Sequence, residues 1–441
     1  MKVLDAVRDD GARLVEMVPD AAAALRSVQP GMRLVPVVYY RPAVAPRVTV
    51  AEPVKTTKAL VTTKVVLSVV SRSDGQPVDG VLVVALTDFT KRIGAQGITD
   101  KQGKVSLALG GAQKIERLYI YPEKGYWSLL KRNLAVAPAL QFGLLSVDLE
   151  YTDGLRHFYG YGKDDDGNSV KVGVVDTGVG PHPDLIVAGG ENTVLGESPL
   201  EYANNGKGHG THVAGIIAAR GTPPSGLRGL APAVTLYSYR VFGQAQDSAS
   251  SYSIIKAIDR AVAAGCDLIN LSLGGGPADD ATRSAIEDAR AAGSVVIAAA
   301  GNDGRQAVSY PAAEAMALAV AALGRKGTFP SDSTAVGDVM KPFGTDKQDF
   351  AASFSNIGPE IDLIGPGVDI LSTVPGGYAS MSGTSMACPA VTGVAARLLS
   401  TRRDLLKMPR NQARSDAIIR ALLKMARALG FGPAFEGRGL P

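Results

Sequence analysis

The sequence predicts that residues 151–441 form an α/β domain with a mainly parallel sheet, preceded by a domain of strands alone. The apolar, β-branched run 171–175 ends in Asp176 and a Thr-Gly turn, which is typical of a buried parallel strand that leads into a loop. The small-residue run 386–396 is typical of a helix that packs closely against such a sheet. Residues 59–150, in contrast, show alternating strands separated by glycine turns, the pattern of a β-sandwich.

The N-terminal part divides into a small α+β segment and a linker. Within residues 1–45 we expect a strand at 12–17, a helix at 19–28 and a second strand at 33–40. Residues 42–53 are rich in proline and valine, which predicts a linker, and we place this linker at residues 46–58. The task of the β-sandwich that follows stays open between a spacer, a folding aid and a binder of carbohydrate or protein.

Composition and charge exclude several classes of function. A length of 441 residues favours two or three domains, and a net charge of +4 is too small to indicate a nucleic-acid-binding protein. No apolar run reaches about 18 residues, so we expect no membrane-spanning helix. Residues 1–10 are charged and lack the apolar core of a signal peptide. Cys266 and Cys388 lie in apolar contexts, so we expect no disulfide framework.

Ser385 lies in a Gly-Thr-Ser-Met-Ala motif and is the candidate nucleophile of an acyl-transfer site. A serine hydroxyl reacts poorly unless a general base lies within hydrogen-bond reach, and imidazole suits this role near neutral pH. Of the four histidines, His157 lies in a Tyr- and Gly-rich segment and His182 between two prolines, where a base would be poorly held. His209 and His212, three residues apart at the start of an expected helix, remain as candidates.

Two further polar residues follow apolar runs. Asp176 ends its strand at the edge where functional groups of parallel sheets gather, so its carboxylate could fix the tautomer of a catalytic histidine. Asn302 closes the run 298–301, and its amide could donate to an oxyanion formed on the substrate. The competing interpretations are a turn-capping aspartate and an Asn-Asp-Gly turn.

These residues occur in the order Asp, His, Asn, Ser, and successive members of the Asp-His-Ser set lie 33 and 176 positions apart. The motifs and their order resemble those of the subtilisin-like serine proteases, or subtilases. The resemblance implies a subtilisin-like three-layer fold in which Asp176 orients the base His209, Ser385 attacks the peptide bond and Asn302 stabilises the oxyanion. It leaves His212 as a packed, hydrogen-bonded helix residue.

The function expected from this resemblance is a serine endopeptidase that works through an acyl-enzyme and is made as a zymogen. The alternative on the same fold is a catalytically silent scaffold that binds peptides or proteins. A nucleotide-binding protein is excluded, because glycines 274–276 lack the Lys-Ser/Thr of a phosphate loop and the strand ending at 176 lacks the dinucleotide glycine pattern.

The resemblance also implies where a substrate would bind. Short stretches after the run 268–271 and before Tyr252 would pair with its backbone from two sides. Ser309 would form the floor of the pocket for the residue before the cleaved bond. No acidic group is expected in that pocket, so we expect broad specificity with neutral or apolar side chains. The expected backbone-binding residues are Ser272, Leu273 and Gly274 on one side and Ser248, Ala249 and Ser250 on the other.

No cofactor is expected for the chemistry. A structural calcium ion is an expectation of the resemblance, and Asp184 is a candidate ligand, although one carboxylate does not define a site. Residues 1–45 resemble the second half of an inhibitory prodomain, so the expected partners are protein or peptide substrates and the chain's own N-terminal segment. Residues 325–350 exceed the usual connection and are expected to form a surface loop. The family implies secretion, whereas the missing signal peptide leaves the cytoplasm as the alternative.

Overall fold

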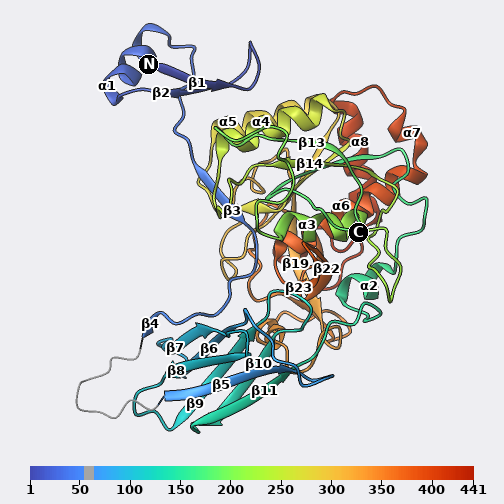
Figure 1. The fold of residues 1–441 in the computed structure, drawn as a ribbon. Helices are drawn as coiled ribbons and strands as arrows, with labels where there is room; N and C mark the ends of the chain where they lie inside the picture. The colour runs from blue at the N-terminus through green and yellow to red at the C-terminus, as the bar shows by residue number, and fades with distance from the viewer. Residues whose placement is uncertain (54–63) are drawn as a thin grey trace.

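The computed structural model describes residues 1–53 and 64–441, so the second half of the expected linker and the expected first strand residues of the β-sandwich, at 54–63, lie outside the described residues. Figure 1 shows a small N-terminal unit and a β-sandwich at opposite ends of an α/β domain. The extended stretch that contains β3 (Tyr39–Pro42) leads from the N-terminal unit along the α/β domain towards the sandwich (Figure 1).

The α/β domain is built around an eight-stranded, mainly parallel sheet, as the sequence predicts. Its strands are β12 (Lys171–Asp176), β13 (Val187–Asn192), β14 (Thr235–Arg240), β16 (Leu268–Leu271), β18 (Val295–Ala299), β19 (Leu318–Arg325), β20 (Asp349–Ala351) and β21 (Ile361–Pro366). The order is β13-β14-β12-β16-β18-β19-β20, with β21 also paired to β19 and β20 antiparallel to β19. Every residue of the central strands β16 and β18 is buried, the pattern of a parallel sheet covered on both faces.

Helices cover both faces of this sheet and complete a three-layer fold (Figure 1). The helices of the domain are α2 (Gly154–Tyr159), α3 (His209–Ala218), α4 (Ser251–Ala263), α5 (Asp280–Ala291), α6 (Thr384–Thr401), α7 (Arg403–Leu406), α8 (Gln412–Met425) and α9 (Pro433–Glu436). The domain also contains a hairpin of β22 (Ile370–Val374) and β23 (Gly377–Met381). Val172 and Val174 of β12 pack with α3 and α6, whereas Val175 packs with α4 and α5. Helix α6 lies so close that a side chain at Gly365 of β21 would come within 2.8 Å of the Ala387 carbonyl oxygen.

The preceding part contains two packed sheets, which we call the sandwich. Its strands are β4 (Glu52–Pro53), β5 (Lys64–Ser71), β6 (Leu82–Asp88), β7 (Ile93–Ile98), β8 (Lys104–Ala108), β9 (Lys114–Tyr121), β10 (Leu129–Ala135) and β11 (Ala139–Leu144). The sheets β10-β9-β6-β7-β4 and β11-β5-β8 enclose a separate hydrophobic core. The described part of the expected linker belongs to this domain, because β4 pairs in parallel with β7.

Residues 325–350 hold the sandwich against the α/β domain and do not form the free surface loop that we expected. The Asp332 carboxylate accepts from the Arg72 guanidinium at 2.8 Å and from the Lys131 ammonium at 3.0 Å, both in the sandwich. Trp127, which is 1% exposed, extends from the sandwich into the core of the α/β domain. The insertion is therefore a docking platform.

A carboxyl group in this platform makes stability depend on pH. Asp338, in the 3-10 helix η1 (Thr334–Asp338), is partly exposed as a residue, but burial of its carboxyl group raises its pKa to about 7. This value exceeds the ordinary 3.8, so the stability contributed by protonated Asp338 is full below pH 3.8 and is lost as the pH rises to about 7.

We expect Asp338→Asn, which mimics the neutral acid, to raise the unfolding midpoint at about pH 8 and to change it little at about pH 4. The physical reason is that the amide keeps an acceptor for the Ser353 hydroxyl, which lies 3.0 Å from the carboxyl oxygen, and never has to be charged. Thermal unfolding at both pH values checks this. Equal shifts at the two values would contradict the assignment.

The N-terminal unit contains the expected helix and an additional strand. Helix α1 (Pro19–Val28) has the predicted bounds, and β1 (Lys2–Ala6) pairs antiparallel with β2 (Arg13–Glu16). The unit rests on α4, where the Lys256 ammonium donates to the Asp5 carboxylate at 2.7 Å.

The second expected strand is wrong in its bounds. Strand β3 covers Tyr39–Pro42 and not 33–40, because only this stretch meets partner strands. Those partners are β15 (Ala249–Ser250) and β17 (Leu273–Gly274), which belong to the α/β domain. The N-terminal segment is thus joined to the α/β domain by backbone pairing.

Candidate active site

A carboxylate–imidazole pair is formed at the carboxyl end of β12. Asp176 is the last residue of β12 and His209 the first of α3, and Nδ1 of His209 donates to Oδ1 of Asp176 at 2.7 Å. A glycine must follow the histidine, because a side chain at Gly210 would come within 2.5 Å of the Gly178 carbonyl oxygen. With the proton on Nδ1, Nε2 is left to act as the base, and it has no hydrogen-bond partner among the described residues.

The predicted nucleophile lies in the first turn of α6. Ser385 is buried, and its Oγ donates to the carbonyl oxygen of Ser272 at 2.9 Å. The hydrogen bond between Ser385 and His209 is not formed in this arrangement. Hydrogen bonds between a catalytic serine and its base commonly form only in the reacting complex. Ser385 and His209 are therefore both in the site, and the hydrogen bond between their side chains is the contact that would form there.

Two N–H groups near the nucleophile could bind an oxyanion. Asn302 follows β18, and its Oδ1 accepts from the Thr384 N–H at 2.8 Å, which orients the side chain. Its Nδ2 is buried and has no acceptor within the described part of the chain. The backbone N–H of Ser385 is the second donor, and it points to the carbonyl oxygen of Ala43 at 3.0 Å. A buried amide that lacks an acceptor, together with a carbonyl that accepts from the serine N–H, is the arrangement expected of an oxyanion hole.

Strand β3 fills the cleft between the two predicted binding strands. Tyr40 pairs with Ala249, while Arg41 and Pro42 pair with Gly274 and Leu273. The β3 backbone is the middle strand of a three-stranded antiparallel sheet, which is how extended peptides add to sheet edges.

The chain then crosses the nucleophile. The Ala43 N–H donates to the Ser272 carbonyl oxygen at 3.1 Å, and the Ala43 carbonyl oxygen accepts from Ser385. The peptide bond between Ala43 and Val44 is thus the one presented to Ser385. Of the six expected backbone-binding residues, Ser248 lies outside β15, and sequence reasoning did not identify Ala43 as the residue at the nucleophile.

An apolar pocket encloses Tyr40, four residues before this bond. Tyr40 has no exposed surface and packs with Ile254, Leu273 and Ile286 in one hydrophobic cluster. Burial raises the pKa of its hydroxyl to about 12. A side chain at Gly276 would come within 2.7 Å of the Tyr40 ring, so a glycine there makes room for the aromatic group.

Ser309 lies beside the cleft, but its surroundings are not free of charge. The Ser309 side chain lies next to the backbone of Gly274 and of Gly301. A side chain placed at Gly301 would come within 2.1 Å of the Ser309 hydroxyl oxygen. That hydroxyl donates to Asp303 at 3.3 Å. The Asp303 carboxylate, directly after Asn302 in the sequence, thus lies within hydrogen-bond reach of Ser309, and the expected preference for neutral or apolar side chains stays a prediction.

The other candidates of the sequence have structural contacts. His212 is fully buried, both backbone carbonyls near its Nε2 lie within 3.1 Å, and burial lowers its pKa to about 3, so it is a neutral packed residue. The Asp184 carboxylate accepts from the Leu227 N–H at 2.8 Å and the Tyr378 hydroxyl at 2.9 Å. Among residues 1–53 and 64–441 no group of three His, Cys, Asp or Glu could hold a metal ion, and calcium at Asp184 stays a prediction.

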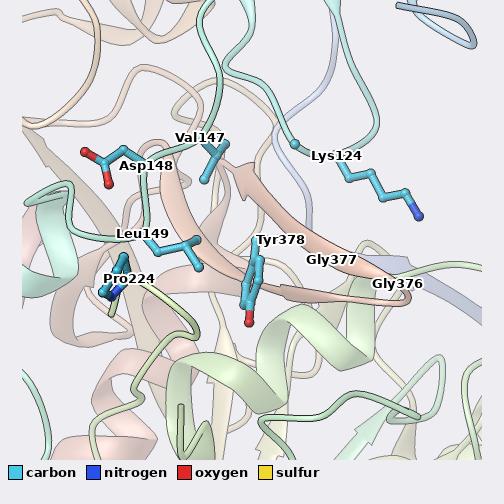
Figure 2. Close-up of a pocket in the computed structure, with 9 residues that line it drawn as sticks. Lys124, Val147, Asp148, Leu149, Pro224, Gly376, Gly377 and Tyr378 are labelled. Atoms are coloured by element: carbon cyan, nitrogen blue, oxygen red, sulfur yellow. The ribbon is translucent and has the colours of Figure 1, made fainter. Parts of the chain in front are cut away.

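A groove of about 510 Å³ lies next to Asp184, where residues 147–149, which follow the sandwich, meet the α/β domain (Figure 2). Its lining includes Val147, Leu149 and Tyr378, whereas the Lys124 side chain points away from Tyr378 in Figure 2. No triad residue lines it. The cleft at Ser385, which the chain itself fills, therefore remains the candidate active site.

Comparison with known proteins agrees with this geometry. Residues 167–435 match the model of the subtilase family. The M-protease of Shouchella clausii (strain KSM-K16) is 43% identical over 232 residues, which cover 52% of this chain and 54% of that protein. Subtilisin DY of Bacillus licheniformis is 40% identical over 240 residues, which cover 53% of this chain and 78% of that protein. Subtilisin Savinase of Lederbergia lenta is 42% identical over 232 residues, which cover 52% of this chain and 76% of that protein.

The matched region thus spans about half of this chain and about half of the M-protease. In the described part of the chain, no helix is long and apolar enough to cross a membrane. The family model covers the sheet, the helices α3 to α8 and all four residues of the site, and this chain belongs to the subtilase family.

Proposed function

We propose that this chain is a serine endopeptidase that hydrolyses peptide bonds through an acyl-enzyme. One observation carries the proposal: the Ser385 N–H donates to the carbonyl of an extended peptide, beside an imidazole that Asp176 already orients at 2.7 Å. A carbonyl in that position is the group that a triad serine attacks.

In the proposed reaction, side chains and one backbone N–H of this chain carry out each step. Ser385 attacks the carbonyl carbon while His209 takes its proton, and Asp176 stabilises the imidazolium. The Ser385 N–H and the Asn302 amide bind the oxyanion. His209 then gives the proton to the leaving amine, and a water molecule hydrolyses the ester. These steps need no cofactor.

Labelling with a fluorophosphonate tests this function. The reagent reacts with a serine only when its base and oxyanion donors are assembled, so we expect one label per chain, at Ser385, in processed protein. Ser400→Ala, on the same helix and away from the cleft, is the matched control and should label normally. A chain that takes no label would instead be a silent scaffold that binds peptides.

We further propose that the first substrate is the chain itself, at the bond between Ala43 and Val44. The support is that residues on both sides of Ser385 are already paired with the cleft, as a substrate would be. Residues 1–43 would then block the cleft until they leave, because a tethered blocker has a high effective concentration. A cutting rate independent of protein concentration would show that the cut is made within one chain.

We expect the pocket around Tyr40 to set specificity. Two peptides that differ only by Tyr or Ser four residues before the cleaved bond should differ about 10- to 100-fold in kcat/KM, because a buried aromatic side chain gains about 1.5–3 kcal/mol. The control is the same exchange one residue later, where Arg41 is exposed. If the Tyr-to-Ser exchange changed kcat/KM equally at the two positions, the pocket around Tyr40 would not set specificity.

A further inference from the structure

One face of the sandwich is apolar where solvent would be expected. In the five-stranded sheet, Val83, Ala85 and Ile120 face the core of the sandwich. The residues of opposite parity form a second cluster on the other face, which we call the arm face: Val84, Leu86, Tyr119, Tyr121 and Leu130. All five are buried. Exposed faces of such sheets are normally polar, so an apolar one needs a cover.

Residues 44–53, the leaving arm, supply part of that cover. Val48 and Val50 pack against the arm face. The Val48 N–H donates to the Tyr121 hydroxyl at 3.1 Å, and the Val50 N–H donates to Gln96 at 2.9 Å. Farther along, β4 pairs with β7. The leaving arm is therefore bound to the sandwich over most of its length.

The start of the leaving arm lies on the other side of the proposed cut. Val44 follows the residue whose carbonyl accepts from Ser385, and the Ala45 N–H donates to the Ser382 carbonyl oxygen at 2.8 Å. The sandwich that holds the rest of the arm is itself fixed by Asp332 and by the buried Trp127. Breaking one peptide bond would change none of these contacts.

We propose that the arm face keeps the leaving arm in place after the bond between Ala43 and Val44 is cut, so that the new Val44 amine stays beside Ser385 and the cut is reversible. The proposal rests on the proposed self-cleavage. In this proposal the sandwich acts as a clamp that holds the segment beginning with the new Val44 amine.

The chemistry balances in both directions. In the forward step an ester forms between Ser385 Oγ and the Ala43 carbonyl carbon, the C–N bond breaks, and the serine proton passes through His209 to the Val44 nitrogen. In the reverse step the amine attacks the ester, remakes the C–N bond and returns the proton through His209 to Oγ. Water competes by giving the Ala43 carboxylate, which the same site can convert back to the ester with loss of that water. A tethered amine is present at high effective concentration, which favours the reverse step.

The chain offers a matched pair of variants on one strand. Tyr119 and Tyr121 are both buried, and their ring centroids lie 5.9 Å apart. The Tyr121 hydroxyl accepts from the Val48 N–H of the leaving arm, whereas the Tyr119 hydroxyl accepts from the Arg117 guanidinium. Tyr121→Phe therefore removes one hydrogen bond to the arm, and Tyr119→Phe removes a comparable hydroxyl without touching it.

The experiment follows the mass of the full-length chain with time until the ratio of intact to cut chain is constant. We expect wild type to retain a constant intact fraction, and isolated cut complex to regain intact chain. Tyr121→Phe should lower the intact-to-cut ratio about two- to tenfold, the effect of one hydrogen bond, while Tyr119→Phe should match wild type. The double variant Val48→Ser/Val50→Ser should lower the ratio further.

The outcomes separate the clamp from the protease. Complete cutting of wild type with no recovery of intact chain, or equal ratios for the two Phe variants, would overturn the clamp while leaving self-cleavage intact. A wild-type chain that is never cut between Ala43 and Val44 would overturn the self-cleavage and the clamp with it.

Discussion

Ser385→Ala is expected to lose hydrolysis almost completely and to remain a single uncut chain. The substitution removes the nucleophile but keeps the backbone N–H that binds the Ala43 carbonyl. The expected loss in turnover is about 10⁶-fold, the size of the effect in subtilisin. Casein or peptide hydrolysis by wild type and variant measures it.

Loss of fold must be distinguished from loss of chemistry. The only hydrogen bond that the deleted hydroxyl donates goes to the Ser272 carbonyl, so the unfolding midpoint should change little. Ser400→Ala, at a half-buried position near the far end of the same helix, should keep full activity. More than a few per cent of wild-type hydrolysis in a folded Ser385→Ala chain would mean that another residue is the nucleophile.

Asp176→Asn should lower turnover by about 10⁴-fold with the fold retained. The wild-type carboxylate accepts from His209 Nδ1 and from the Thr177 N–H, both at 2.7 Å. An amide in this position offers donors of its own, which favours the histidine tautomer with the proton on Nε2, and that tautomer cannot accept the serine proton. The lost charge also no longer stabilises the imidazolium.

Steady-state kinetics and an unfolding curve check this prediction together. A loss concentrated in kcat, with substrate affinity preserved, is expected of a group that acts through the base. A variant that keeps more than about a tenth of wild-type turnover would show that the 2.7 Å contact only holds the helix in place.

The positions of Asp176, His209, Asn302 and Ser385 in the fold could be predicted from sequence, because each residue is part of a local motif at the start or end of an element; their catalytic roles stay a proposal. Asp176 closes a β-branched run, and His209 and Ser385 lie in the first turns of helices of small residues, so local patterns place them at one edge of the sheet. The bounds of α1 were predictable for the same reason, since a proline marks its start.

Contacts between distant segments were not predictable in this way. Strand β3 ends two residues later than expected because β15 and β17, more than 200 residues away, decide which stretch is paired. The docking role of Asp332 depends on cations brought from another domain. Arg414 lies in a basic C-terminal stretch, yet it is 1% exposed and its guanidinium donates to Asp267 at 2.6 Å. Nothing in the local sequence records these partners.

The most direct test of the central claim is the N-terminal sequence of the purified chain, determined for wild type and for Ser385→Ala. If the cleft acts on the peptide bond that it holds, the cut fraction of wild type begins at Val44, and the variant yields only the original N-terminus. A cut at a different bond, or the same cut in Ser385→Ala, would contradict the account, because the bond presented to Ser385 would then not be the one that this serine hydrolyses.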